Sequence, residues 1–152
     1  MEMRNKRYQY AAVFTPAEEG GYVVTFPDVP EAITQGESIQ ECIKEAADAL
    51  EEAIIGRINT GKVIPEATPP KSGDYIIPVP PQSAFKAALY EEIQRLGWNN
   101  LEVAGFLGID EKEVRRLLDP HHSSKLPRIA EILERVGKRI VVSVHDETEQ
   151  VA

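Results

Sequence analysis

The sequence has a single cysteine, Cys42, so no disulfide can form within the chain. Cys42 lies in an apolar helical row, which indicates a buried structural thiol rather than a nucleophile. No apolar run is long enough to cross a bilayer, and the first seven residues lack the apolar stretch of a signal peptide. We therefore expect a cytoplasmic protein with no membrane partner.

Residue groups that would indicate catalysis or metal binding are also missing. His121 and His122 are adjacent, which is not the helical spacing that converges on a metal. Asp28 follows a predicted strand, but no matching acid is evident within the strands to form a metal-dependent site, and the neighbouring prolines favour a turn. No Ser/His/Asp set or glycine-rich phosphate loop is recognisable. We expect no catalytic residue, no metal site and no cofactor.

Acidic residues outnumber basic ones, and the excess is unevenly placed. The net charge is −8, and residues 1–82 contain 7 Lys/Arg against 13 Asp/Glu, a net −6. Residues 83–145 contain 10 against 9, a net +1, and three further acids lie in the last seven residues. This asymmetry suggests two domains whose partners differ in charge.

Alternating apolar residues predict strands in the first part of the chain, at 7–14, 22–26 and 33–36. Gly20-Gly21 forms the turn of a hairpin between the first two strands. Ser38 then caps a long helix, with Glu41 as its capping-box partner and with Gly56 and Gly61 bracketing its end. The inner face of this helix is apolar. Its outer face is acidic and includes Glu41, Glu45, Asp48, Glu51 and Glu52. Such a face is most often simply solvated, and a binding role is the alternative.

A proline-rich stretch, residues 65–81, separates the two halves of the chain. Six prolines in these seventeen residues favour an extended, semi-rigid linker. Within it, 75–79 is apolar enough for a last edge strand. We place the domain boundary between 81 and 82, which gives an α+β domain at 1–81 and a helical domain at 82–152.

The stretch 99–118 indicates two short helices joined by a tight turn. Gly108 ends the first helix, since glycine adopts a positive φ without a Cβ penalty. Asp110 caps the second helix, with Glu113 completing a capping box. A small apolar residue, Ala104, lets the two helices cross closely. These features are typical of a helix-turn-helix that places its second helix in the DNA major groove, and an ordinary helical hairpin is the alternative.

Two flanking helices complete the predicted second domain. Ser83 caps a helix that runs to Leu96, and another helix covers 126–136 with Gly137 after it. Four helices, with the pair second and third, match the phage-repressor type of DNA-binding domain. Residues 139–144 read as a final strand, and the same strand of a second copy is its simplest partner. We therefore expect a homodimer or a higher even oligomer.

The outward residues of the second short helix are the candidates for reading DNA bases, namely Glu111, Lys112, Arg115 and Arg116. Arginine and lysine bind guanine acceptors, whereas Glu111 is expected mainly to favour the helix dipole. Asn99 and Asn100 begin the first short helix and Lys125 precedes the last one, so these three are candidates for phosphate contacts.

The chain as a whole resembles the HicB family of type II antitoxins. The match in the first domain consists of the strand 8–14, EGGY at 19–22, FPD at 26–28, TQG at 34–36 and the helix from Ser38. The second domain resembles the helix-turn-helix variant, through VAGFLGI, VRRLLDP, HHSSKL and GKRIVV in that order. The resemblance implies a partial ribonuclease-H-like first domain that binds a small basic HicA toxin, which is an mRNA-cleaving ribonuclease. It also implies repression of the protein's own operon.

Two other functions remain open from the sequence. The first is an orphan transcriptional regulator without a cognate toxin, whose first domain senses something else or only assembles the oligomer. The second is a nucleic-acid-processing enzyme, which the ribonuclease-H-like outline suggests and the missing carboxylates disfavour.

Overall fold

The computed structural model describes residues 5–147 and 149–152, in the element order β1–β2–β3–α1–β4–α2–α3–α4–α5. The chain divides into two compact units. The first comprises residues up to 53 together with 65–80 and 144–152, and the second comprises 54–64 and 81–143. Of the helices in the described part of the chain, none could span a membrane.

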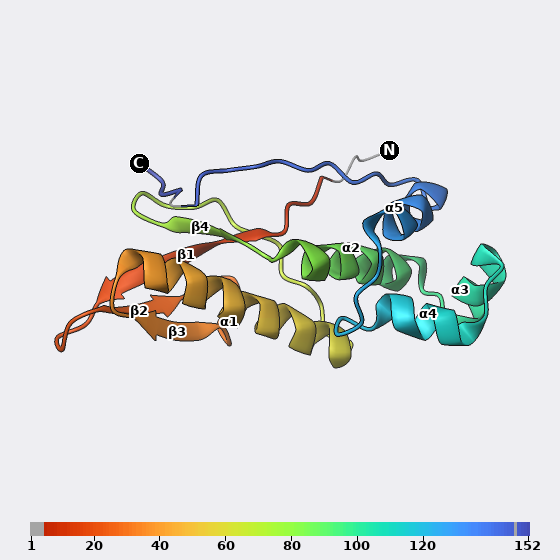
Figure 1. Cartoon of the computed structure of the whole chain (residues 1–152), viewed down its shortest axis with the longest axis horizontal. Coiled ribbons are helices and arrows are strands. Elements are labelled where there is room, and N and C mark those ends of the chain that lie inside the picture. Colours follow the sequence, from red (N-terminus) through yellow and green to blue (C-terminus); the bar gives the residue numbers. More distant parts are fainter. Residues whose placement is uncertain (1–4, 148) are drawn as a thin grey trace. The chain divides into compact units, whose positions relative to one another are not determined.

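The first unit is a four-stranded antiparallel sheet with one helix packed on it (Figure 1). The strand order is β3–β2–β1–β4, with β1 at Gln9–Pro16, β2 at Tyr22–Thr25, β3 at Ile33–Gly36 and β4 at Tyr75–Pro78. The helix α1 spans Ile39–Asn59. The sheet and the helix are therefore those predicted, including the edge strand within the proline-rich stretch.

The helix α1 lies very close to the end of β3. A Cβ atom on Gly36 would lie 2.8 Å from Cys42 Sγ and 2.9 Å from the Cys42 backbone nitrogen, so only glycine fits there. Cys42, Ala46 and Leu50 repeat every four residues along α1 and are fully buried. Burial raises the pKa of the Cys42 thiol, with Glu41 and Glu37 adding to the effect. Cys42 is thus a buried structural thiol, as expected.

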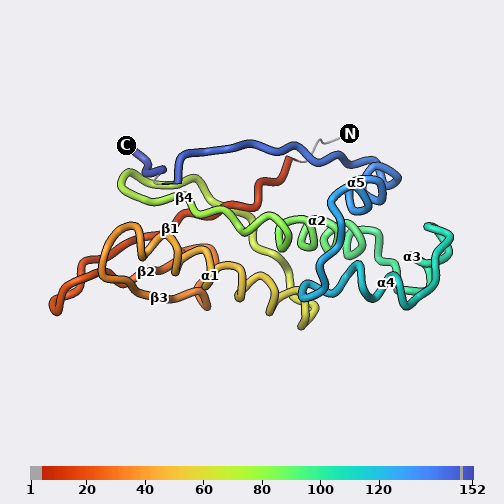
Figure 2. The backbone as a smooth tube through the Cα atoms, viewed as in Figure 1, coloured from red at the N-terminus to blue at the C-terminus, as the bar shows by residue number. Residues whose placement is uncertain are grey.

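The second unit contains four helices: α2 at Pro81–Leu96, α3 at Asn100–Leu107, α4 at Glu111–Leu118 and α5 at Leu126–Arg135 (Figure 2). Its larger core cluster joins α2, α4 and α5 through Leu89, Leu117, Ile129, Ile132 and Leu133. The last turn of α1 and the following loop also belong to this unit, where the Tyr90 hydroxyl donates to the Lys62 carbonyl at 2.8 Å. The α+β class is confirmed.

The end of α1 is as expected, and the start of α2 is not. α1 ends at Asn59, between Gly56 and Gly61, and its apolar row extends to Ile58, which is 7% exposed. α2 begins at Pro81 rather than with a cap at Ser83, and Ser83 is buried within its first turns. Proline is favourable at the first helical position, where the missing N–H would have no helical partner.

The expected strand at 139–144 is not formed in the described chain. These residues have no regular secondary structure, and Val141, Val142 and Val144 are 81%, 69% and 94% exposed. A strand requires a neighbouring strand for its backbone bonds, and a single chain supplies none here. Instead, pairing occurs later, where Gln150 forms an antiparallel bridge with Tyr75 of β4 and Val151 N–H donates to the Asp74 carbonyl at 2.8 Å.

Candidate nucleic-acid interface and acidic surface

The helices α3 and α4 form the tight pair that the sequence predicts. Gly108 has a φ of +69° and its N–H donates to the Ala104 carbonyl, so it ends α3 in the left-handed conformation. Only residues 108–110 separate the helices. The pair packs over a small cluster of its own, made by Val103 and Ala104 of α3 and Val114 of α4. Ala104 is 8% exposed, in agreement with a close crossing over a small side chain.

The beginning of α3 is more strongly capped than the sequence analysis expected. Asn99 Oδ1 accepts from the Glu102 N–H at 2.8 Å, and the Glu102 carboxylate accepts from the Asn99 N–H at 3.2 Å. This reciprocal capping box satisfies two backbone donors at the helix start. The spacing of Asn99 and Glu102 was the available signal, since it has the form of a cap followed by Glu at the third helical position.

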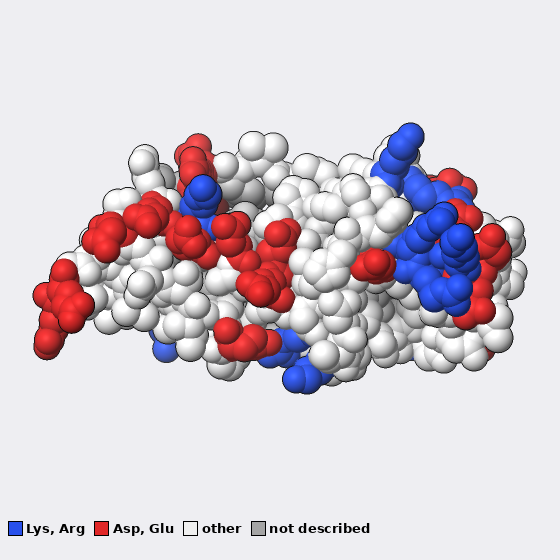
Figure 3. Space-filling model, turned by 60° about the horizontal axis from the view of Figure 1, so that its bottom comes forward, with Lys and Arg blue, Asp and Glu red and all other residues white. Residues whose placement is uncertain are grey.

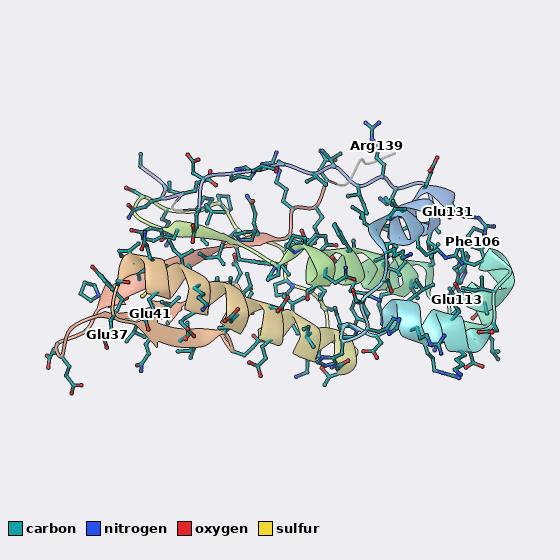
Figure 4. The ribbon with its side chains drawn as sticks, viewed as in Figure 1. Glu37, Glu41, Phe106, Glu113, Glu131 and Arg139 are labelled. Carbon is teal, nitrogen blue, oxygen red and sulfur yellow. The ribbon has the colours of Figure 1, made fainter. Side chains whose placement is uncertain are left out.

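The beginning of α4 is capped differently from the prediction. Asp110 Oδ1 accepts from the Glu113 N–H at 2.7 Å, as expected for an N-cap. Glu113, which Figure 4 labels on α4, does not complete the capping box. Its carboxylate instead accepts from Arg128 Nη2 of α5 at 3.0 Å. A guanidinium is a stronger partner for a carboxylate than a backbone N–H, because the hydrogen bond is charge-assisted at both ends.

The outer face of α4 presents two cations that no described residue engages. Lys112 and Arg116 are exposed, one helical turn apart, and neither side chain forms a hydrogen bond or ion pair within the described chain. Arg115 differs, because its Nη1 lies 3.1 Å from Glu111 Oε1. The structure therefore brings all four predicted base-reading residues onto one short helix and divides them into a paired and an unengaged set. Basic side chains gather over this part of the second unit (Figure 3).

The predicted phosphate-contacting residues lie at helix starts, as expected. Asn99 is the N-cap of α3, and Asn100 is its first residue. Lys125 is the N-cap residue of α5, is exposed and makes no side-chain capping bond. Asn99 Oδ1 is already used by its own helix, which leaves its amide N–H₂ group as the donor for a phosphate.

A buried lysine beneath α4 was not predicted. Lys86 of α2 is 0% exposed, and its Nζ donates to the carbonyls of Arg116 and Leu117 at 3.0 and 2.8 Å and to Ser124 Oγ at 2.7 Å. Burial lowers the pKa of its amine to about 8, and the Asp119 carboxylate opposes that shift. Lys86 shares a helical row with Ser83 and Tyr90, which are both buried, and this spacing was the only sequence signal.

The first unit has an acidic surface along α1 and at the β1–β2 hairpin (Figure 3). Glu41, Asp48 and Glu52 are exposed, and Glu45 and Glu51 are half-buried. An open hollow of about 440 Å³ lies between the β1–β2 hairpin and the end of β3. Its acidic lining residues are Glu18, Glu19 and Glu37. This surface suits a positively charged partner.

The remaining candidates for catalysis have structural roles or no site around them. Both Asp28 carboxylate oxygens accept from Thr68, whose N–H lies at 2.9 Å, so Asp28 fastens the proline-rich segment to the sheet. His121 Nε2 lies 3.4 Å from Asn59 Nδ2, and His122 is exposed. Within the described residues, no group of three or more His, Cys, Asp or Glu side chains is placed to hold a metal ion.

Comparison with known proteins gives the family. The family model described as HicB_like antitoxin of bacterial toxin-antitoxin system matches residues 9–88. The chain belongs to the HicB-like antitoxin family. It is 35% identical over 132 residues to Antitoxin HicB of Escherichia coli (strain K12), covering 87% of this chain and 96% of that protein. It is 32% identical over 139 residues to Antitoxin HicB 1 of Photorhabdus laumondii, covering 91% and 88% of the two chains.

The family model and the relatives cover the two units of this HicB-like protein to different extents. Residues 9–88 contain the sheet, α1 and half of α2, including Lys86, but end before α3. The relatives match over longer stretches, which reach into the helical unit. Family membership therefore bears most directly on the acidic unit, which the family model covers.

Proposed function

We propose that this HicB-like antitoxin binds and neutralises a small basic HicA-type toxin, an mRNA-cleaving ribonuclease, and represses its own operon by binding operator DNA. The acidic first unit would hold the toxin, and α4 would read the DNA. The observation that carries the DNA part is the pair of unengaged cations, Lys112 and Arg116, on a short helix that follows a glycine turn. The role requires no catalytic residue and no cofactor, and it places the protein in the cytoplasm.

The candidate DNA-binding residues differ in whether another residue of the chain already binds them, and this sets how much each is expected to contribute to DNA affinity. Arg116 and Lys112 donate to guanine O6 and N7, which is worth about 1–3 kcal/mol of discrimination for each good bidentate pair. Arg115 must first give up its ion pair with Glu111, so its contribution is smaller. Asn99, Asn100 and Lys125 bind phosphates and orient α4 without reading sequence. A dimer binds half-sites about 34–36 Å apart, or a multiple of that spacing.

The DNA part is tested by selecting a binding sequence from a random duplex library with the full chain. We expect one sequence family to be enriched, and the Lys112→Ala/Arg116→Ala double variant to lose it. Lys44→Ala is the control, since Lys44 is an exposed cation on α1, outside the second unit. Failure of the wild-type chain to enrich any sequence would refute DNA recognition.

The toxin part is tested with the product of a short basic reading frame next to the gene. We expect the two proteins to co-purify and the antitoxin to rescue growth when they are co-expressed. Asp48→Lys/Glu52→Lys should slow association, because complementary charge mainly speeds encounter. Glu134→Lys on α5, also an exposed acid, is the matched single-site control. Sequence-specific DNA binding without any toxin partner would instead indicate an orphan regulator.

Self-association is the third part of the proposal. Val141, Val142 and Val144 form an exposed apolar segment after the last helix. Pairing of 139–144 with the same segment of a second copy would supply the neighbouring strand that a single chain lacks, and the valines of the two copies would lie side by side. Sedimentation should show an even oligomer that Val142→Glu dissociates, whereas Val63→Glu, at another exposed valine outside the segment, should leave it intact. A monomeric wild-type chain would refute this part.

A further inference from the structure

Two polar residues of α2, Gln82 and Lys86, are one helical turn apart and both bind the end of α4 or the loop after it. Lys86 Nζ donates to the Arg116 and Leu117 carbonyls and to Ser124 Oγ. Gln82 Oε1 accepts from the Ser124 N–H at 3.0 Å. We call these two residues the α2 clamp. Four hydrogen bonds thus join α2 to the end of α4 and to Ser124 in the loop that precedes Lys125.

The three bonds of Lys86 use all three N–H donors of its ammonium group. The last carbonyls of any helix lack partners within the helix, and Lys86 satisfies two of them at the end of α4. A positive charge there is also favoured by the helix dipole. Lysine is almost never fully buried unless it is paired, so the bonds explain how the charge is tolerated.

Stability alone does not account for a buried charge at this position. Removing a lysine ammonium from water has a large desolvation penalty, and well-packed apolar side chains often replace buried ionic groups with no loss of stability. What an apolar residue cannot do is fix the two helices in one orientation through directed bonds. The clamped segment begins with the backbone of Arg116, a predicted base reader, and ends next to Lys125, a predicted phosphate contact.

We propose that Lys86 and Gln82 are positioning residues for DNA readout, which hold the end of α4 and the residue before Lys125 at a fixed distance from each other. The inference depends on the proposed DNA binding and adds the residues that make it selective. Neither residue touches DNA. Their effect is on the ratio of affinities for the correct and the wrong sequence, because base contacts require α4 to sit at a defined depth and angle while phosphate contacts tolerate small shifts.

The test measures binding of two duplexes by fluorescence anisotropy: the sequence that the wild-type chain selects and a scrambled duplex of the same length. Lys86→Met keeps the length and apolar stem of the side chain and removes its donors. Lys138→Met is the matched control, since Lys138 also binds α2, through a 3.8 Å ion pair with Glu92, but lies outside the clamp. Gln82→Ala removes the second clamp bond at a half-buried site.

We expect Lys86→Met to lower the ratio of the two affinities by roughly tenfold or more, the discrimination of one good base contact, with affinity for the scrambled duplex unchanged. Lys138→Met should leave the ratio unchanged, and Gln82→Ala should lower it by a smaller factor. A merely structural role would reduce the active fraction and affect both duplexes equally, which would overturn the inference. An unchanged ratio in folded Lys86→Met would overturn it too.

The test also covers a Lys86→Met variant that does not fold and a wild-type chain that selects no duplex. If Lys86→Met does not fold, the ratio measured for Gln82→Ala decides, and an unchanged value refutes the clamp. If the wild-type chain selects no duplex, the proposed DNA binding fails and the positioning role fails with it. A selected duplex with an intact ratio in both variants refutes only the positioning role.

Discussion

The buried amine of Lys86 makes the stability of the helical unit depend on pH in an unusual direction. The pKa of Lys86 is about 8 in the folded chain, against its ordinary value of 10.5, because burial penalises the ammonium form. The Asp119 carboxylate, which follows α4, opposes this shift. The Lys86 amine donates its hydrogen bonds to two carbonyls and the Ser124 hydroxyl, none of which is charged. Between these two pKa values the unfolded chain binds a proton that the folded chain has released. The free energy of unfolding therefore rises with pH in that window.

The size of the effect follows from the shift. A difference of about 2.5 pKa units corresponds to roughly 3 kcal/mol, since each unit is worth about 1.4 kcal/mol. Below pH 8 the full penalty of burying the charge is present. It disappears progressively as the pH rises toward 10.5, where the unfolded lysine also loses its proton. An ordinary surface lysine, whose pKa is the same in both states, would contribute no such change.

Urea unfolding followed by tryptophan fluorescence measures this directly. Trp98 is the only tryptophan, and it packs against Phe106 in the second unit with ring centroids 4.8 Å apart. Comparing the wild-type chain with Lys86→Met at each pH cancels the other groups that titrate in alkali. We expect the difference in unfolding free energy to move in favour of the wild type by roughly 3 kcal/mol between about pH 7 and about pH 10.5. Parallel pH profiles for the two proteins would show that the amine is not desolvated.

Three other changes have defined outcomes. Arg116→Ala should weaken binding to the selected duplex by about 1–3 kcal/mol and relax preference at one base pair. Arg115→Ala should weaken binding less, because Arg115 is already paired with Glu111. Footprinting and competition measure both variants, and equal losses would contradict the different roles assigned to the two arginines. Lys125→Ala should weaken all sequences alike and reduce the slope of log affinity against log salt by about one, and an unchanged slope would exclude a phosphate contact. Gly36→Ala should destabilise the first unit by about 1–3 kcal/mol, because the new Cβ would lie 2.8 Å from Cys42 Sγ. Thermal melts measure this, and an unchanged melting temperature would show that α1 can move away.

Local chemistry explains which features could be predicted from the sequence. The strand at Ile33–Gly36, the turn at Gly108 and the cap at Asp110 each depend on residues within a few positions of one another, and all three are present. The start of α2 was harder, since Ser83 is a common capping residue while Pro81 is favourable at the first helical position. The placement of the exposed face of α4 followed from its apolar period alone.

The features that were missed depend on partners far away in the sequence. Glu113 binds Arg128 rather than its own helix start, and Lys86 binds carbonyls thirty residues later. Gln150 and Val151 pair with Tyr75 of β4 and with Asp74, which lie about half the chain earlier in the sequence. No local pattern in 149–151 indicates that these residues pair with β4. Each depends on a partner that only the folded chain brings near, which a single sequence does not resolve.

The ion pairs of the second unit neutralise several of the acids on and near α4, which favours the proposed approach of this helix to DNA. Glu111 is paired with Arg115, and Glu113 and Glu131 both lie within 4.0 Å of Arg128, at 3.0 and 3.7 Å. Lys112 and Arg116 remain as unengaged charges on α4. Screening limits their attraction for phosphate to about 8 Å at physiological salt. With so few cations available, non-specific binding should be weak, and discrimination must come from base contacts made by a well-positioned helix. The proposed selectivity therefore depends on the bonds of Lys86 as much as on Arg116, the proposed base reader.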